Sequence, residues 1–93
     1  MNKYILINHG VGSSEGWEQY FAMLHERGHM IGGSALDYGL SVTGGHFAEP
    51  ISHTITGYIV IQAKDLETAK SLAAQCPVHV AGGTVEVFTL IKT

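Results

Sequence analysis

The sequence contains a single cysteine, a single arginine and no long run of hydrophobic residues. Cys76 has no second cysteine with which to form an internal disulfide bond, which favours a reducing compartment. The longest apolar runs have four or five residues, whereas a membrane-spanning helix needs about 20, so no transmembrane segment is expected. The first residues include one lysine and no long hydrophobic region, so we expect no signal peptide and a cytoplasmic location.

Positive charge is also scarce, and this narrows the classes of partner. Five lysine and arginine residues stand against eight acidic residues, which gives a formal net charge of −3. Nucleic acids and anionic membranes both attract basic proteins, so neither is expected as a partner. The 93 residues, 45% of them apolar, are enough for one ordinary globular domain, and we expect residues 1–93 to form it.

The hydrophobic pattern predicts four strands and two helices. Trp17, Tyr20, Phe21 and Leu24 share one helical face, and Gly28 ends that helix. The expected strands cover residues 3–9, 29–36, 56–62 and 84–92. The second helix should begin after a cap at Asp65, end at Pro77 and bury Leu66, Ala69, Leu72, Ala73 and Cys76. Ser13 and Ser14 are plausible caps for the first helix.

A polar, glycine-rich segment lies between the second and third of these strands. Residues 40–42 and 46–48 flank Thr43-Gly44-Gly45, a pattern typical of a β-hairpin. The complete order is then strand, helix, strand, hairpin, strand, helix, strand. This order predicts an α+β fold of the ferredoxin-like plait type, with an antiparallel sheet and both helices on one face.

The strands are apolar on both sides. Tyr58 and Val60 alternate with Ile59 and Ile61, and Val85, Val87 and Ile91 alternate with Phe88 and Leu90. Two helices can cover only one face of the sheet, and an apolar sheet face of this size is rarely left in water. We therefore expect a homodimer in which the open faces of two copies pack together.

Several stretches of this chain resemble the YCII-related domain family, in particular its DGPF group. They are residues 24–33, 44–49 (Gly-Gly-His-Phe-Ala-Glu), 57–58, 66–69, 74–77 and 82–87. The resemblance implies a dimeric α+β barrel. The resemblance also implies that the relatives of this chain are mostly uncharacterised and that some of them accompany sigma factors. One branch of the family has a proposed histidine–aspartate active site. Gly44 and His46 replace the signature aspartate and proline, and Trp17 or a neighbour stands where that branch has its helix histidine. Whether this chain is an enzyme is therefore left open.

Five residues are candidates for binding a ligand. His46 and Glu49 lie in the glycine-rich segment, and a histidine beside a carboxylate can act as a general base. His9 ends the first strand, Asp37 follows the second, and Trp17 begins the first helix. These positions predict a small-molecule cleft between the sheet and the hairpin. Solvated loop residues, a simple turn and helix packing explain the same residues equally well.

Two further ligand classes find little support in the sequence. His25 and His29 have the spacing of a helical metal pair, but Gly28 between them ends the helix. The segment from His9 to Ser14 lacks the third glycine of a dinucleotide fingerprint and the lysine of a phosphate-binding loop. No cofactor and no metal are therefore predicted. The alternatives to a ligand-binding protein are a non-catalytic partner or sensing module, and a metal-binding role for the six histidines.

Overall fold

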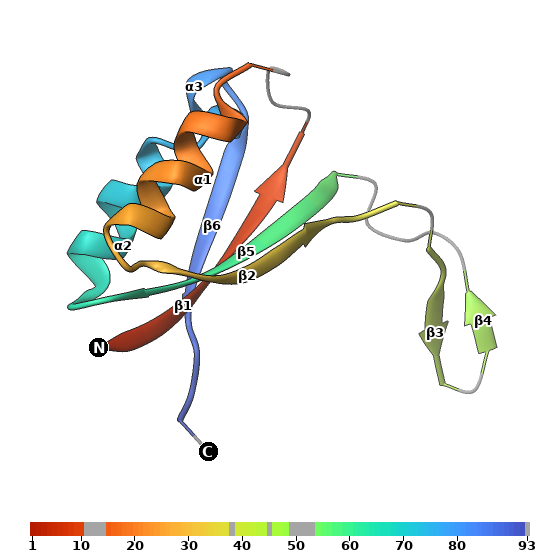
Figure 1. The fold of residues 1–93 in the computed structure, drawn as a ribbon. Coiled ribbons are helices and arrows are strands. Elements are labelled where there is room, and N and C mark those ends of the chain that lie inside the picture. Colours follow the sequence, from red (N-terminus) through yellow and green to blue (C-terminus); the bar gives the residue numbers. More distant parts are fainter. Residues whose placement is uncertain (11–14, 38, 45, 49–53, 93) are drawn as a thin grey trace.

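The computed structural model describes residues 1–10, 15–37, 39–44, 46–48 and 54–92. The elements in chain order are β1 (Asn2–His9), α1 (Trp17–Glu26), β2 (Met30–Ala35), β3 (Ser41–Thr43), β4 (His46–Ala48), β5 (Ile55–Ala63), α2 (Leu66–Ala74), α3 (Pro77–Val80) and β6 (Thr84–Thr89). Four strands form a sheet in the order β2-β5-β1-β6, and every neighbouring pair is antiparallel. Figure 1 shows the three helices on one face of this sheet. The arrangement is an α+β fold with the strand order of a ferredoxin-like plait, as the sequence predicts.

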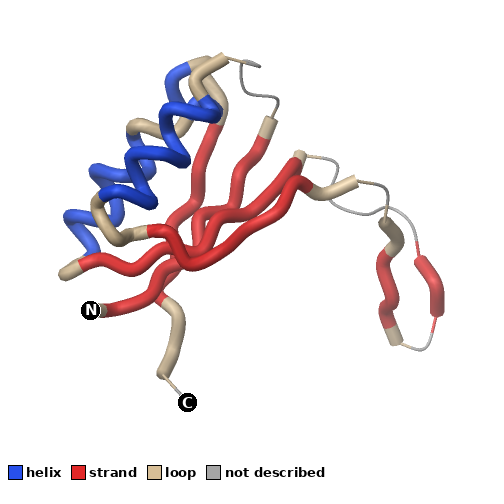
Figure 2. The backbone as a smooth tube through the Cα atoms, viewed as in Figure 1, coloured by secondary structure: helices blue, strands red, loops and turns tan. Residues whose placement is uncertain are grey.

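The hydrophobic core lies between the sheet and the helix layer, which Figure 2 shows as two separate layers. Tyr4 and Leu6 of β1 and Ile59 and Ile61 of β5 face the helices, because alternate residues of a strand share a face. The helices and the connection between them add Tyr20, Leu24, Ala69, Leu72, Ala73, Cys76 and Val78 to this core.

The two long helices begin differently. Asp65 caps α2, since its Oδ1 accepts hydrogen bonds from the Thr68 backbone nitrogen at 2.8 Å and from the Thr68 hydroxyl at 2.7 Å. Helix α1 begins at Trp17, and Gly16 at its N-cap has φ 90°, a conformation that suits glycine. The expected caps Ser13 and Ser14 lie outside the described residues. Gly28, with φ 74°, follows the end of α1 as predicted.

Three details of the prediction are wrong. Leu66 is 50% exposed rather than buried, because it begins α2 and no preceding turn covers it. Cys76 is not part of α2, which ends at Ala74, and Pro77 starts the separate short helix α3. Strand β6 ends at Thr89, and Ile91 is 87% exposed. The Leu90 backbone nitrogen donates to the Lys3 carbonyl near the start of β1, so later residues have no strand to pair with.

The predicted hairpin is confirmed as a two-stranded sheet of its own. Ser41 pairs with Ala48 and Thr43 with His46, and Gly44 takes φ 56° in the turn. Figure 1 shows β3 and β4 extending away from the four-stranded sheet and from α1.

The face of the sheet opposite the helices carries apolar side chains across adjacent strands. Ile5 of β1 pairs with Val60 on one side and with Phe88 on the other, and Ile7 pairs with Tyr58. Phe88 is 51% exposed. We call this surface, made by Ile5, Ile7, Tyr58, Val60 and Phe88, the open face.

Candidate functional site

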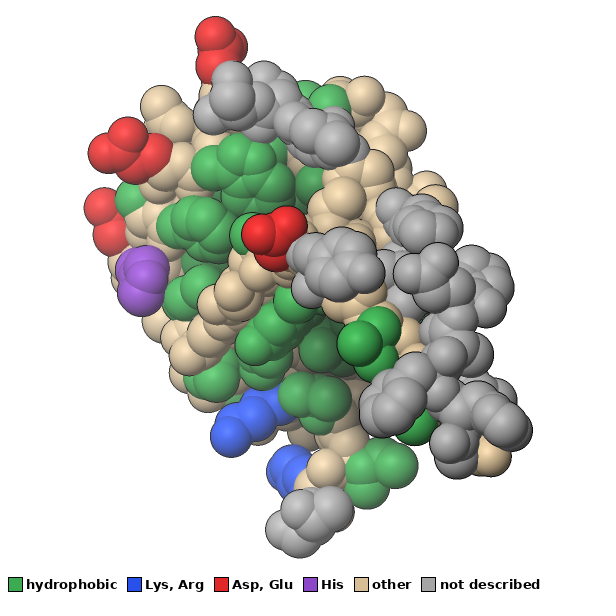
Figure 3. Space-filling view, turned by 90° about the vertical axis from the view of Figure 1, so that its right-hand side faces the viewer, with side chains coloured by type: hydrophobic (Ala, Val, Ile, Leu, Met, Phe, Trp, Pro, Cys, Tyr) green, Lys and Arg blue, Asp and Glu red, His purple; other side chains and the backbone are tan. Residues whose placement is uncertain are grey.

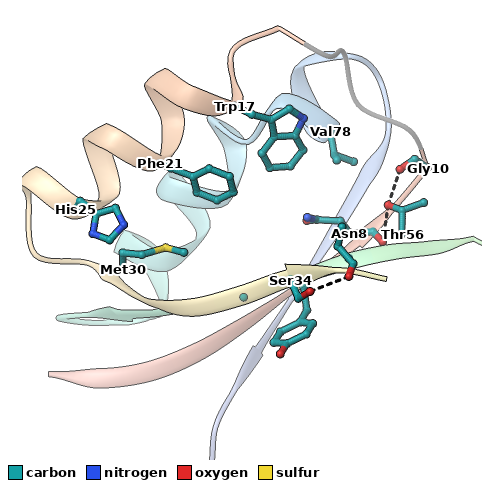
Figure 4. Close-up of a pocket in the computed structure, with 13 residues that line it drawn as sticks. Asn8, Gly10, Trp17, Phe21, His25, Met30, Ser34, Thr56 and Val78 are labelled. Carbon is teal, nitrogen blue, oxygen red and sulfur yellow. Dashed lines mark hydrogen bonds between the residues drawn. The ribbon is translucent and has the colours of Figure 1, made fainter. Parts of the chain in front are cut away.

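A cleft of about 780 Å³ lies between α1 and the helix-covered side of the sheet. Its lining comes from β1, α1, β2, β5 and α3, together with Gly10 after β1: Asn8, Gly10, Trp17, Phe21, His25, Met30, Gly33, Ser34, Ala35, Thr56, Gly57, Tyr58 and Val78. Figure 4 shows the side chains of Trp17, Phe21, His25 and Met30 between the helix and the strands. Figure 3 looks at the side of the molecule from which the hairpin extends, and hydrophobic side chains gather there between the helices and the sheet.

One wall of the cleft is a stripe of α1. Trp17, Phe21 and His25 are spaced by four residues, so they project from the same helix face. The rings of Trp17 and Phe21 stack, with centroids 5.5 Å apart and planes 30° from parallel. Tyr20 meets the Trp17 ring edge to face at 6.3 Å. These contacts hold the aromatic wall in one arrangement.

Two glycines on neighbouring strands line the cleft opposite this wall. A Cβ on Gly33, which has φ 155°, would lie 2.5 Å from the Tyr58 carbonyl oxygen. A Cβ on Gly57 would lie 3.1 Å from the Ser34 carbonyl oxygen. Gly33 therefore excludes any side chain, and Gly57 leaves little room for one. The strands present bare backbone to the cleft at both positions.

The inner end of the cleft carries one buried amide. Asn8 is 4% exposed, and the Cys76 sulfur lies 3.9 Å from its Oδ1. Burial raises the pKa of the Cys76 thiol, so the thiol stays protonated and donates to this oxygen. The amide nitrogen Nδ2 is then on the other side, and Figure 4 shows it pointing into the cleft. No hydrogen bond from this nitrogen is formed among the described residues.

A second polar cluster lies on the other side of the sheet. His9 Nε2 is 2.5 Å from Glu86 Oε1, and His9 Nδ1 is 2.9 Å from the Thr54 hydroxyl. His9 follows Asn8 and therefore points to the opposite face, beside the open face. The predicted site residue His9 thus does not line the cleft.

The other predicted site residues do not gather in one cleft between the sheet and the hairpin, as the sequence led us to expect. Trp17 lines the cleft, whereas Asp37 is exposed after β2 and is not part of the lining. His46 belongs to β4, but its side chain is not described. Glu49 lies outside the described residues. Both therefore remain predictions. No described residue of the hairpin lines the cleft.

Most residues of the cleft and of the second cluster were not among the five predicted site residues; Asn8, Phe21, Gly33 and Glu86 are examples. Asn8 could have been recognised from the strand pattern. It lies on the same side of β1 as the buried Tyr4 and Leu6, where a polar side chain is unexpected. Phe21 could have been found as the residue one helical turn after Trp17. Gly33 and Glu86 depend on strand pairing, which the sequence does not display.

The described residues bring no three histidine, cysteine, aspartate or glutamate side chains together in a way that could hold a metal ion. His29 directs its Nδ1 to the Gln62 carbonyl oxygen, 2.9 Å away, whereas His25 lies on the wall of the cleft. Within the described part of the chain, no helix has both the length and the hydropathy needed to cross a membrane.

A scan against protein-family models finds no match, and no curated protein matches the chain. The resemblance to the YCII-related family therefore stays a prediction from its motifs.

Proposed function

We propose that this chain is a small-molecule-binding protein whose ligand occupies the cleft between α1 and the sheet. The observation that carries the proposal is the cleft itself, about 780 Å³ with an aromatic wall and one inward-facing amide. Ligand pockets are commonly 300–1,000 Å³, mostly apolar, with a few well-placed polar groups. This cleft is not the one expected from the sequence between the sheet and the hairpin, because α1 forms its wall and no described residue of the hairpin lines it.

Binding rather than catalysis is the use that this lining favours. Two residues with titratable side chains are among the lining residues. The side chain of Tyr58 belongs to the open face, and the His25 imidazole has no hydrogen-bonded carboxylate partner among the described residues. The histidine that does have such a partner is His9, on the other side of the sheet. Acid or base chemistry in the cleft would need a group that the ligand itself supplies.

We also propose that two copies pair through the open face, as in the dimeric α+β barrel implied by the YCII-related resemblance. Five apolar side chains on adjacent strands form a surface that a second copy would bury. Charge also favours this partner. Lys3 lies on this side near the start of β1, and Glu86 lies on it beside Ile7. A two-fold axis across the strands would place Lys3 of one copy near Glu86 of the other.

Membership of the YCII-related family and a cytoplasmic location belong to the same proposal. The family membership is supported by the motifs of the sequence. The location is supported by the single cysteine, which is buried and unpaired.

Trp17 provides a direct test, because it is the only tryptophan and lines the cleft. We test three compounds separately: naphthalene, fluorenone and decanol. At least one of them should shift the fluorescence of Trp17 and raise the melting temperature of the protein. Ala35→Phe would fill the cleft from β2 and should abolish both effects. Ala22→Phe adds the same ring on an exposed residue of α1 and should leave them unchanged. No response of the wild-type protein to any of these compounds would contradict the proposal, as would undiminished binding by Ala35→Phe.

A further inference from the structure

The two sides of the cleft define the shape of what it can hold. One side is the stacked pair Trp17 and Phe21, and the other includes the bare backbone at Gly33 and Gly57. The cleft therefore has an aromatic wall on one side and a backbone surface without side chains on the other. A flat, conjugated ring system suits both surfaces, because it can stack on aromatic rings and lie against bare backbone better than a twisted or branched molecule can.

The polar group at the inner end defines one atom of the ligand. The Oδ1 of Asn8 already accepts from the Cys76 thiol, and its Nδ2 points into the cleft without a partner among the described residues. Asn8 is 4% exposed, so a ligand that covers the amide nitrogen without offering an acceptor would leave buried N–H groups unpaired, which is unfavourable. The complementary group is a hydrogen-bond acceptor, such as a carbonyl oxygen.

The charge of the lining defines the ligand further. No lysine or arginine is among the lining residues that the structure describes. The chain as a whole carries a net charge of −3. A carboxylate or phosphate buried beside Asn8 would therefore lack a fixed opposite charge, which makes its burial unfavourable.

From these three observations we propose that the cleft binds a planar, uncharged aromatic ketone or a related conjugated carbonyl compound. Its rings lie between the aromatic wall and the glycine backbone, and its carbonyl oxygen accepts a hydrogen bond from Asn8 Nδ2. This inference rests on the proposed function and names the chemical class of the ligand.

Three small probes separate the features of the proposal. Fluorenone is planar and has a carbonyl group, fluorene lacks only the carbonyl group, and benzophenone keeps the carbonyl group on a twisted frame. Titration calorimetry on the wild-type protein should show fluorenone binding about three- to tenfold more tightly than fluorene, as one hydrogen bond allows. Benzophenone should bind more weakly than fluorenone.

Asn8→Leu tests the role of the amide, because it removes the donor and keeps a side chain of similar size. It should bind fluorenone and fluorene equally. Asn2→Leu makes the same substitution at the other end of β1, away from the cleft lining, and should keep the wild-type preference. If Asn8→Leu does not fold, the affinities of fluorenone and fluorene for the wild-type protein still test the hydrogen bond to Asn8.

Equal affinities of fluorenone and fluorene for the wild-type protein would overturn the hydrogen bond to Asn8. Equal affinities of fluorenone and benzophenone would overturn the claim that the cleft selects a planar ligand. Binding of decanol without binding of any aromatic probe would overturn the ligand class and leave the proposed function intact. A protein that binds neither these four compounds nor naphthalene would contradict the proposed function itself.

Discussion

The hydroxyl group of Tyr20 donates a hydrogen bond to the backbone carbonyl of Leu72 at 2.9 Å, which joins α1 to α2. Tyr20 is buried, and burial raises the pKa of its phenol, so the hydroxyl remains a donor throughout the physiological range. Trp17 and Phe21 both contact the Tyr20 ring. The bond between the helices therefore also positions the aromatic wall of the cleft.

Tyr20→Phe should lower the free energy of unfolding by about 1 kcal/mol, the typical contribution of one such hydrogen bond. Urea denaturation followed by circular dichroism measures the loss. Ser71→Ala, at an exposed position of α2, should change stability by less than about 0.5 kcal/mol. Equal stability of Tyr20→Phe and the wild-type protein would show that the bond contributes nothing.

Val60→Asp should prevent pairing of two copies, because Val60 is in the centre of the open face. An unpaired carboxylate buried at an interface costs several kcal/mol, so the dimer should weaken at least about 100-fold. Sedimentation at micromolar protein measures the state of assembly, with Ser71→Asp on exposed α2 as the control. A folded wild-type monomer under these conditions would contradict the dimer. Ile61 is not suitable for this test, since it is fully buried under the helices.

Gly33→Ala should destabilise the fold by about 1–3 kcal/mol, because its backbone conformation and the nearby Tyr58 carbonyl leave no room for a methyl group. Gly32→Ala is the matched control. A Cβ at Gly32 would meet no atom within 4 Å, so this neighbour should tolerate alanine with a change below about 1 kcal/mol. Thermal denaturation of both variants measures the contrast, and similar melting temperatures would contradict it.

Acid should weaken the cap of α2. The hydrogen bonds from the Thr68 hydroxyl and backbone nitrogen favour the ionised carboxylate and lower the pKa of Asp65. The Asp65 carboxylate therefore binds a proton less tightly in the folded state than in the unfolded chain, where the pKa of an aspartate is about 4. The stabilisation is complete above that pH and is lost as the pH falls through the lower folded value.

Melting temperatures at pH 7 and pH 3 measure this dependence. Asp65→Asn keeps a capping oxygen but does not titrate, so its melting temperature should fall less between the two pH values than that of the wild type. Asp37→Asn, at an exposed residue after β2, should behave like the wild type. An equal fall for Asp65→Asn and the wild type would rule out the cap as a source of acid sensitivity.

Cys76 should react slowly with thiol reagents, because it is fully buried and burial raises the pKa of its thiol. At pH 8 the folded protein should be labelled on the order of 100-fold more slowly than the urea-unfolded protein. Ser71→Cys adds an exposed thiol that should be labelled rapidly. Rapid labelling of Cys76 in the folded chain would contradict its buried position.

The sequence predicted the strands and the hairpin because both follow from local patterns. Alternating apolar residues identify strands, and Gly44-Gly45 between two short segments identifies a turn. The cleft was not predictable in the same way. Its lining includes Gly33 and Gly57, which come onto neighbouring strands only when β2 pairs with β5. Likewise, the pairing of β1 with β6 brings His9 to Glu86, 77 residues away along the chain.

Strand β2, which contributes Gly33 to the cleft, is also an edge of the sheet. Its pairing with β5 shifts register between Met30 and Gly32, and Gly33 then takes a conformation that ordinary strand residues rarely adopt. An irregular edge is a poor template for a strand from another molecule. The backbone that lines the cleft at Gly33 thus also makes this edge a poor site for edge-to-edge aggregation.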